Sequence, residues 1–231
     1  MDEFDRYIER LLNAQYDASE SLKHELTKGQ VRERFIRQQI SDQFGGSFIC
    51  VSGVMRLLQN QYKQCDMAIV PHKVRRRGIG EEYLIEPSDT VLIADVKSTL
   101  CLKDMREWND LSDQIHKVCK DKSPQVGIVA YRYPSDTKNI LKAFGYRFDS
   151  SLEGYFYDQK LKLQYPKLDF LLLLHNIEDS EDKRLLVRRN PKPRGRTPQD
   201  YRPFISFQGD HATKQFWEML RSMTDTLFKS E

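Results

Sequence analysis

The sequence has only four cysteines, and their spacing excludes the common cysteine-rich architectures. Cys50, Cys65, Cys101 and Cys119 include no Cys-x-x-Cys pair and no histidine at zinc-finger spacing. No apolar run approaches the roughly eighteen residues needed to span a bilayer. The acidic start of the chain also lacks the basic and apolar regions of a signal peptide. We therefore expect a cytoplasmic protein with reduced thiols and no membrane association.

A strong net charge, an internal repeat and a clear domain boundary are also missing. The formal charge of +3 is by itself too small to indicate nucleic-acid binding. Gly78 and Gly80 do not form a phosphate-binding loop, because no helix-opening Gly-Lys-Ser or Gly-Lys-Thr follows them. A length of 231 residues fits a single domain, 1–231, with an N-terminal helix at about 3–26 and a core at about 27–231.

Alternating helical and strand patterns predict the fold class. Apolar residues recur at helical spacing in five segments: 3–26, 30–43, 103–120, 139–145 and 213–228. Short apolar runs predict strands at 47–53, 64–70, 91–97, 125–131, 168–175, 185–188 and 201–207, with a long connection at 72–88. This order indicates an α/β fold with a mixed central β-sheet flanked by helices. The N-terminal helix either packs on its own domain or contacts a partner.

The predicted strand Val91–Ser98 contains two charged residues near its end, Asp95 and Lys97. Side chains of a strand alternate between its faces, so these two point the same way. Charges at the end of a core strand are costly to bury unless they pair, bind a metal or line a cleft. Upstream, Asp66 stands at the head of the apolar run 66–70. Two acids and one lysine on two strands are typical of a metal-dependent phosphodiesterase.

An acid-x-Lys triplet by itself has little weight, because the chain contains four of them. The triplets that begin at Asp136, Asp158 and Glu181 lie in polar, turn-like sequence, where charges are solvated. Only the triplet at Asp95 ends a buried-looking strand and follows another strand that contains an acid. The strand context makes this triplet a candidate site.

Phosphodiester hydrolysis explains why these residue types would be brought together. A hard cation offsets charge on the phosphate and lowers the pKa of its bound water. Asp66, Asp95 and the Val96 carbonyl could bind Mg²⁺ or Mn²⁺ through oxygen. Lys97 could orient or deprotonate the water, or stabilise developing charge. Glu33, in the second predicted helix, is either a further metal ligand or an exposed helix-face charge.

The pattern resembles the PD-(D/E)xK nuclease superfamily, and more narrowly an uncharacterised bacterial nuclease-like domain family within it. The shared features are a Lys-Gly-x-x-Arg-Glu helix start, a Gln-x-Asp strand and an acid-Val-Lys-Ser strand end. Here these features are the segments 28–33, 64–66 and 95–98. The resemblance covers about residues 24–120 and implies a restriction-endonuclease-like core with an N-terminal helical extension.

Carried over by position, the resemblance implies that Asp66, Asp95 and Glu33 are metal-site acids and Lys97 is the catalytic lysine. It also implies supporting roles for Gln64, on the face of Asp66, and for Gln114 on the helix after the triplet, where an ordinary polar helix face is the alternative. The sequence departs from the family in having Asp at position 95, where Glu is commoner. The spacing from Asp66 to Asp95 is also long.

Basic residues are concentrated in two segments that suit a phosphate backbone. The candidates for nucleic-acid binding are Arg75, Arg76, Arg77, Arg188, Arg189, Lys192, Arg194 and Arg196. The alternative is a pair of solvated loops.

These observations predict a Mg²⁺- or Mn²⁺-dependent endonuclease that acts on nucleic acid, with DNA favoured over RNA. The resemblance also implies a role in bacterial defence. The alternative function is a catalytically inactive nuclease-fold module that binds nucleic acid or a partner protein. A homodimer and an activating partner protein are left open.

Overall fold

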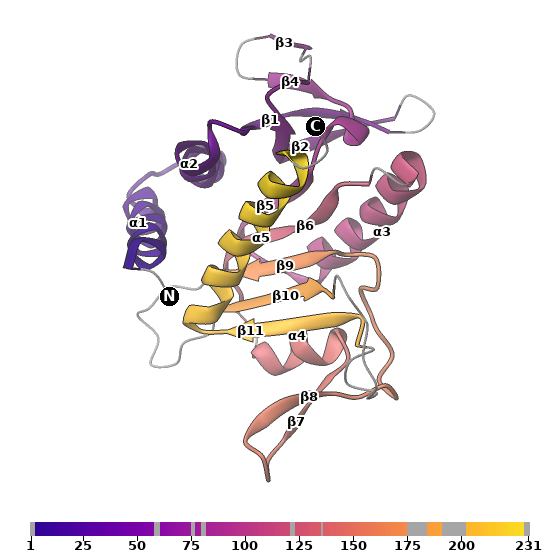
Figure 1. Ribbon diagram of the computed structural model, residues 1–231. Coiled ribbons are helices and arrows are strands. Elements are labelled where there is room, and N and C mark those ends of the chain that lie inside the picture. The colour runs from indigo at the N-terminus through magenta and orange to yellow at the C-terminus, as the bar shows by residue number, and fades with distance from the viewer. Residues whose placement is uncertain are drawn as a thin grey trace.

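The computed structural model contains five α-helices and eleven strands in the described part of the chain (Figure 1). The described residues are 3–57, 61–74, 77–79, 82–120, 123–134, 136–174, 184–190 and 202–228. The helices are α1 (Glu3–Glu20), α2 (Glu25–Phe44), α3 (Leu102–Cys119), α4 (Thr137–Ala143), α5 (Asp210–Phe228) and the short 3₁₀ helix η2 (Pro87–Asp89). The strands are β1 (Phe48–Arg56), β2 (Tyr62–Pro71), β3 (Arg77–Ile79), β4 (Glu82–Ile85), β5 (Leu92–Thr99), β6 (Gln125–Arg132), β7 (Tyr146–Asp149), β8 (Gly154–Tyr157), β9 (Phe170–Leu173), β10 (Leu185–Arg189) and β11 (Phe204–Gln208).

Nine of these strands form one mixed sheet, in the order β11-β10-β9-β6-β5-β2-β1-β4-β3. Strands β5, β6 and β9 at its centre run parallel, and β2 lies antiparallel beside β5. The parallel strands are buried on both faces, which explains why β5 and β6 read as continuous apolar runs. The two acid-bearing strands predicted from the sequence, β2 and β5, are therefore direct neighbours.

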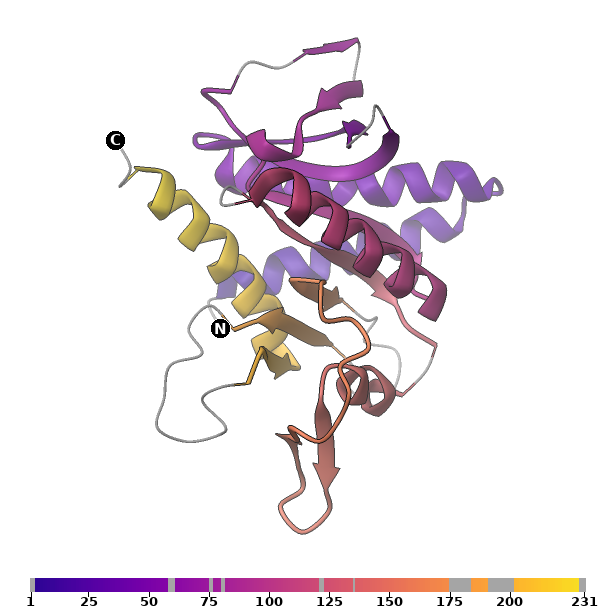
Figure 2. The ribbon, with the colours of Figure 1, turned by 90° about the vertical axis from the view of Figure 1, so that its right-hand side faces the viewer.

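Helices cover both faces of the sheet (Figures 1 and 2). One apolar core packs α3 and α4 against one face, and a second core packs α1, α2 and α5 against the other. The stripe Ile8, Leu12 and Tyr16 of α1 is buried in this second core. The N-terminal helix therefore packs on its own domain. No helix of the described residues is both long enough and apolar enough to cross a membrane.

Two segments differ from the sequence-based expectation. The connection 72–88 contributes β3, β4 and η2, so it extends the sheet beyond β1. The segment 146–157 forms the hairpin β7–β8, which was not predicted and which projects from the main body (Figures 1 and 2). The N-terminal helix also ends earlier than expected, at Glu20, and α2 begins at Glu25. The other predicted helices and strands are confirmed, with small shifts at their ends.

Candidate active site

A β-bulge positions Asp66 on β2. Between the pairs Val51–Ala68 and Gly53–Cys65, β1 has one residue, whereas β2 has two, Asp66 and Met67. A bulge of this kind bends the strand and redirects a side chain, and such bulges are frequent beside active sites. It also breaks the two-residue alternation of β2, so there is no longer a reason for Gln64 to share the face of Asp66.

Asp95 lies opposite Asp66 on the neighbouring strand. The ladder between β2 and β5 ends at the pair Met67–Ala94, and one further step in the same register sets Asp66 against Asp95. Beyond the pair Met67–Ala94 the Val96 N–H donates to a side-chain oxygen, Asp66 Oδ2, at 3.2 Å, where a regular ladder would use a backbone carbonyl. The two carboxyl groups therefore meet where the strands stop pairing.

The environment of Asp95 disfavours a free carboxylate. Asp95 is 4% exposed, and its Oδ2 lies 2.9 Å from Lys97 Nζ. This contact is an ion pair. Burial raises the pKa of the Asp95 carboxyl to about 8, and the adjoining Asp66 carboxyl adds to the rise against the opposing effect of Lys97. The site thus contains a carboxyl group that retains its proton near neutral pH.

Lys97 is held as an ammonium group. Burial by itself would lower the pKa of the Lys97 amine. The carboxylates of Asp95, Asp66 and Asp104 outweigh burial, so the pKa is raised. Asp104 lies in the first turn of α3, which places Lys97 near the start of that helix. Lys97 is therefore suited to donating hydrogen bonds and stabilising negative charge.

Helix α2 brings a third acid to the edge of this pair. Burial raises the pKa of the Glu33 carboxyl to about 7, and the nearby Asp66 adds to the rise. Arg37, one turn later, lies 3.6 Å from Glu33 and donates to the main-chain oxygen of Asp66 at 2.7 Å. Arg37 therefore connects the helix to the bulge. It also satisfies a carbonyl that the bulge takes out of the ladder.

The donor set fits a divalent cation held by few protein ligands. In the described part of the chain, no three His, Cys, Asp or Glu side chains form a cluster that could hold a metal ion. The site is instead a facing pair of carboxylates, Asp66 and Asp95, with Glu33 beside it. Mg²⁺ typically uses one or two carboxylates and completes its shell with water and substrate oxygens. A cation would also stabilise the Asp95 carboxylate, whose charge is otherwise unfavourable.

Two residues with an expected supporting role lie on exposed surface. Gln64 is exposed on β2 and Gln114 is exposed on α3. Neither makes a hydrogen bond to the acids among the described residues. For Gln114 this position agrees with the alternative reading, an ordinary polar helix face.

Arg188 and Arg189 are used inside the fold. Arg189 donates to the buried Asp169 at 2.7 Å, and the same carboxylate contacts His116 at 2.8 Å. Arg188 contacts Gln215 at 3.3 Å. Asp169 also accepts from the N–H of Val126, so this cluster lies at the amino-terminal ends of the parallel strands. Lys97 of the candidate site is near the opposite, carboxyl-terminal end of β5. These contacts favour a structural role for both arginines, not contact with nucleic acid.

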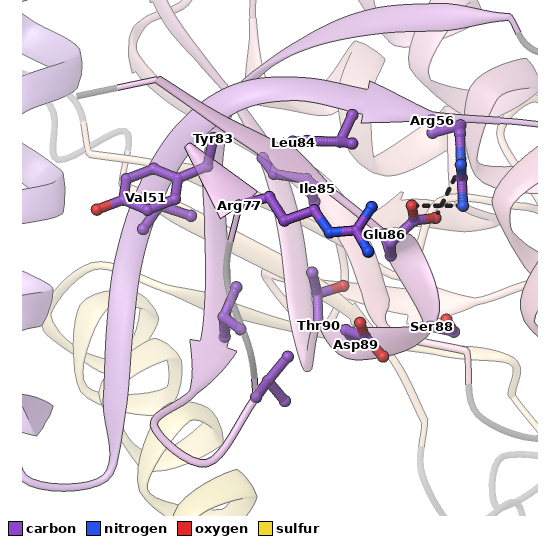
Figure 3. Close-up of a pocket in the computed structure, with 12 residues that line it drawn as sticks. Val51, Arg56, Arg77, Tyr83, Leu84, Ile85, Glu86, Ser88, Asp89 and Thr90 are labelled. Atoms are coloured by element: carbon purple, nitrogen blue, oxygen red, sulfur yellow. Dashed lines mark hydrogen bonds and ion pairs between the residues drawn. The ribbon is translucent and has the colours of Figure 1, made fainter. Parts of the chain in front are cut away.

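Arg77 projects over a pocket that is separate from the acids. This pocket has a volume of about 420 Å³, with Tyr83 and Val51 at one end and the ion pair of Arg56 and Glu86 at the other (Figure 3). The other basic candidates, Arg75, Arg76, Lys192, Arg194 and Arg196, lie outside the described residues.

Arg37 and the bulge are the parts of the site that sequence reasoning missed. The spacing of Glu33 and Arg37, four residues apart in a helix, is a sequence signal for an ion pair. Gly53, in the strand opposite the bulge, is a second signal, because a glycine inside a strand often marks a bulge or a close backbone approach. Neither signal says which carboxylate is affected.

No protein-family model and no curated protein sequence match the chain. Among solved structures, the cAAA-bound form of NucC from P. aeruginosa ATCC27853 aligns with a TM-score of 0.69 and 8% identity, covering 98% of this chain and 91% of that chain. The chain has the fold of NucC. The expected α/β class, a mixed central sheet flanked by helices, is thus confirmed.

NucC from E. coli MS115-1 is similar in two forms. Its cAAA-bound form gives a TM-score of 0.67 at 9% identity, over 98% of this chain and 90% of that chain. Its apo form gives a TM-score of 0.59 at 9% identity, over 96% of this chain and 91% of that chain. The chain is therefore more similar to the cAAA-bound form than to the apo form. At this level of identity the likeness establishes the fold alone.

Proposed function

We propose that this chain is a metal-dependent endonuclease that hydrolyses phosphodiester bonds in DNA as part of bacterial defence. The observation that supports this most directly is the meeting of Asp66, Asp95 and Lys97 where two neighbouring strands separate. The fold shared with NucC adds support to this proposal. The narrower family suggested by the sequence motifs remains a prediction.

The proposed cofactor is Mg²⁺ or Mn²⁺, held by Asp66, Asp95 and the Val96 carbonyl, with Glu33 beside them. When bound, such a cation offsets phosphate charge and makes water more acidic. Lys97 donates to a non-bridging phosphate oxygen, and its ammonium stabilises the charge that develops there. With such a cation present, Asp95 would be a carboxylate and would orient this ammonium across the 2.9 Å contact.

Glu33 is the proposed proton acceptor. A carboxyl group with a pKa of about 7 can exchange a proton with water at neutral pH. In the proposed reaction, water forms a new bond to phosphorus, and Glu33 takes the proton of the attacking water. The bond to the leaving sugar oxygen breaks, and this oxygen takes a proton from solvent water.

Plasmid cleavage tests this proposal. Supercoiled plasmid and RNA are incubated with Mg²⁺ or Mn²⁺, and with EDTA as a control. Since two of the similar NucC structures are cAAA-bound forms, each reaction is run with and without cAAA. Lys97→Ala and Asp95→Ala should abolish cleavage. Lys160→Ala, which replaces an exposed lysine in the acid-x-Lys triplet that begins at Asp158, is the matched control and should cleave normally.

Cleavage that survives both site substitutions would contradict the site assignment. If neither nucleic acid is cut and calorimetry detects no metal binding, the chain is instead an inactive nuclease-fold module. The possible homodimer stays a prediction, which light scattering of the purified chain can check.

A further inference from the structure

A second hollow lies between α2 and β1. Its volume is about 280 Å³, and its lining includes Arg34, Arg37 and Gln38 from α2, Ser52 from β1 and Tyr83 from β4. All its charged side chains in the described part of the chain are arginines. The hollow is therefore positive, whereas the neighbouring site is acidic.

Arg37 connects this hollow to the candidate active site. Arg37 lines the hollow, and its guanidinium lies 3.6 Å from Glu33 and donates to the main chain of Asp66. Ser52 lies opposite the bulge that contains Asp66. Arg37 and Ser52 therefore link the hollow to the elements that hold the acids.

The chemistry of the lining suits a phosphate group. Arginine presents a planar set of donors that matches phosphate oxygens, and Gln38, Ser52 and Tyr83 add neutral donors. A nucleic-acid strand near Asp66 and Asp95 has further phosphates that these carboxylates repel. Cationic side chains beside the acids would offset that repulsion and fix the position of the strand.

We propose that the hollow between α2 and β1 binds a non-scissile backbone phosphate of the nucleic-acid substrate. The proposal rests on the proposed nuclease function. It adds a residue set that would fix the position of the nucleic-acid strand at the site. Arg34 binds the phosphate. Arg37 is a positioning residue as well, because it also holds the bulge at Asp66.

Arg34 is the residue to substitute, because Arg37 is needed for the geometry of the acids. Arg34 is exposed on α2, and alanine is the best helix former, so Arg34→Ala should fold normally. Arg34→Lys keeps the charge and loses the planar donor set. Arg147→Ala, an exposed arginine on the projecting hairpin, removes the same charge elsewhere and is the matched control.

Binding is measured by fluorescence anisotropy with a labelled DNA duplex, in Ca²⁺ without Mg²⁺ or Mn²⁺ so that cleavage is not required. The dissociation constant is followed from about 50 to 300 mM salt. Arg34→Ala should weaken binding equally for unrelated sequences and reduce the salt slope by about 1. Arg34→Lys should restore most of the slope, and Arg147→Ala should leave it unchanged. In cleavage assays, Arg34→Ala should raise KM about fivefold to tenfold with little change in kcat.

The outcomes separate this proposal from the nuclease function. If the wild type cuts DNA and Arg34→Ala keeps the wild-type salt slope, the hollow is not a phosphate site although the function stands. If the slope falls but no variant cuts DNA, the phosphate site is supported and the nuclease function fails. If the wild type does not bind nucleic acid, both proposals are wrong.

Discussion

Replacing Asp95 by asparagine should remove the proposed activity and at the same time stabilise the metal-free protein. The pKa of the Asp95 carboxyl rises from 3.8 to about 8 on folding. Between these values the folded state binds more protons than the unfolded state, so the wild type loses stability as the pH rises. Asparagine does not titrate and avoids this loss. The advantage of the variant should therefore be absent near pH 4 and largest above about pH 8.

The size of the effect follows from the shift in pKa. A shift of about four pKa units corresponds to at most about 6 kcal/mol of unfolding free energy. This shift already includes the opposing attraction of Lys97, so the loss of the 2.9 Å ion pair in the variant adds no separate cost. We therefore expect a gain of several kcal/mol above pH 8, with about 2–4 °C in Tm for each kcal/mol in a chain of this length.

Thermal unfolding in EDTA at several pH values measures this gain without metal binding. Asp110→Asn, in which an exposed carboxyl on α3 is replaced, is the control and should give no pH-dependent gain. Asp95→Asn should also lose plasmid cleavage with Mg²⁺. An Asp95→Asn variant that is equally or less stable than the wild type at every pH would refute the inference that Asp95 is a disfavoured, buried carboxyl.

Three further predictions concern the metal, the lysine and the sheet. Protons on Asp95 and Glu33 should compete with Mg²⁺ or Mn²⁺ below the pKa values of these carboxyls, about 8 and about 7. The affinity for the metal should therefore fall as the pH is lowered, by up to about tenfold per pH unit for each proton displaced. Calorimetry in two buffers of different ionisation enthalpy counts these protons, and a pH-independent affinity contradicts the prediction. Lys97→Ala should slow single-turnover cleavage at least about 100-fold with little change in DNA affinity; a rate within threefold of wild type argues against its role. Gly53→Ala should destabilise the protein by about 2–3 kcal/mol in urea unfolding, because its Cβ would lie 1.9 Å from a backbone oxygen of β4. Gly46→Ala, whose Cβ meets nothing within 4 Å, should not.

The fold could be predicted well where the apolar pattern is local. The strands β5 and β6 are short apolar runs bounded by polar turns, and α3 and α5 have clear apolar stripes. The connection 72–88 could not be recognised as β3, β4 and η2 in this way. Edge strands are half exposed and short, so they have little apolar pattern of their own. β4 becomes a strand because the neighbouring β1 offers unpaired backbone groups, and β3 does so because β4 offers them in turn.

The site could be predicted in part. The alternation of side chains in β5 was enough to put Asp95 and Lys97 on one face, and they form an ion pair. The role of Glu33 was ambiguous, since a helix-face acid is ordinarily exposed. Its pKa is perturbed only because α2 packs against the sheet beside Asp66.

The sequence alone determined which residues of this chain are candidates for chemistry. Two acids and a lysine lie at the ends of apolar strands, and burial of such charges is unfavourable unless they have a function or a partner. The tertiary structure alone decided that β2 and β5 are neighbours in a register that sets Asp66 against Asp95. It also decided that a bulge and Arg37 hold Asp66 there. Strand order and register depend on contacts between residues about thirty positions apart, and a local sequence pattern does not encode them.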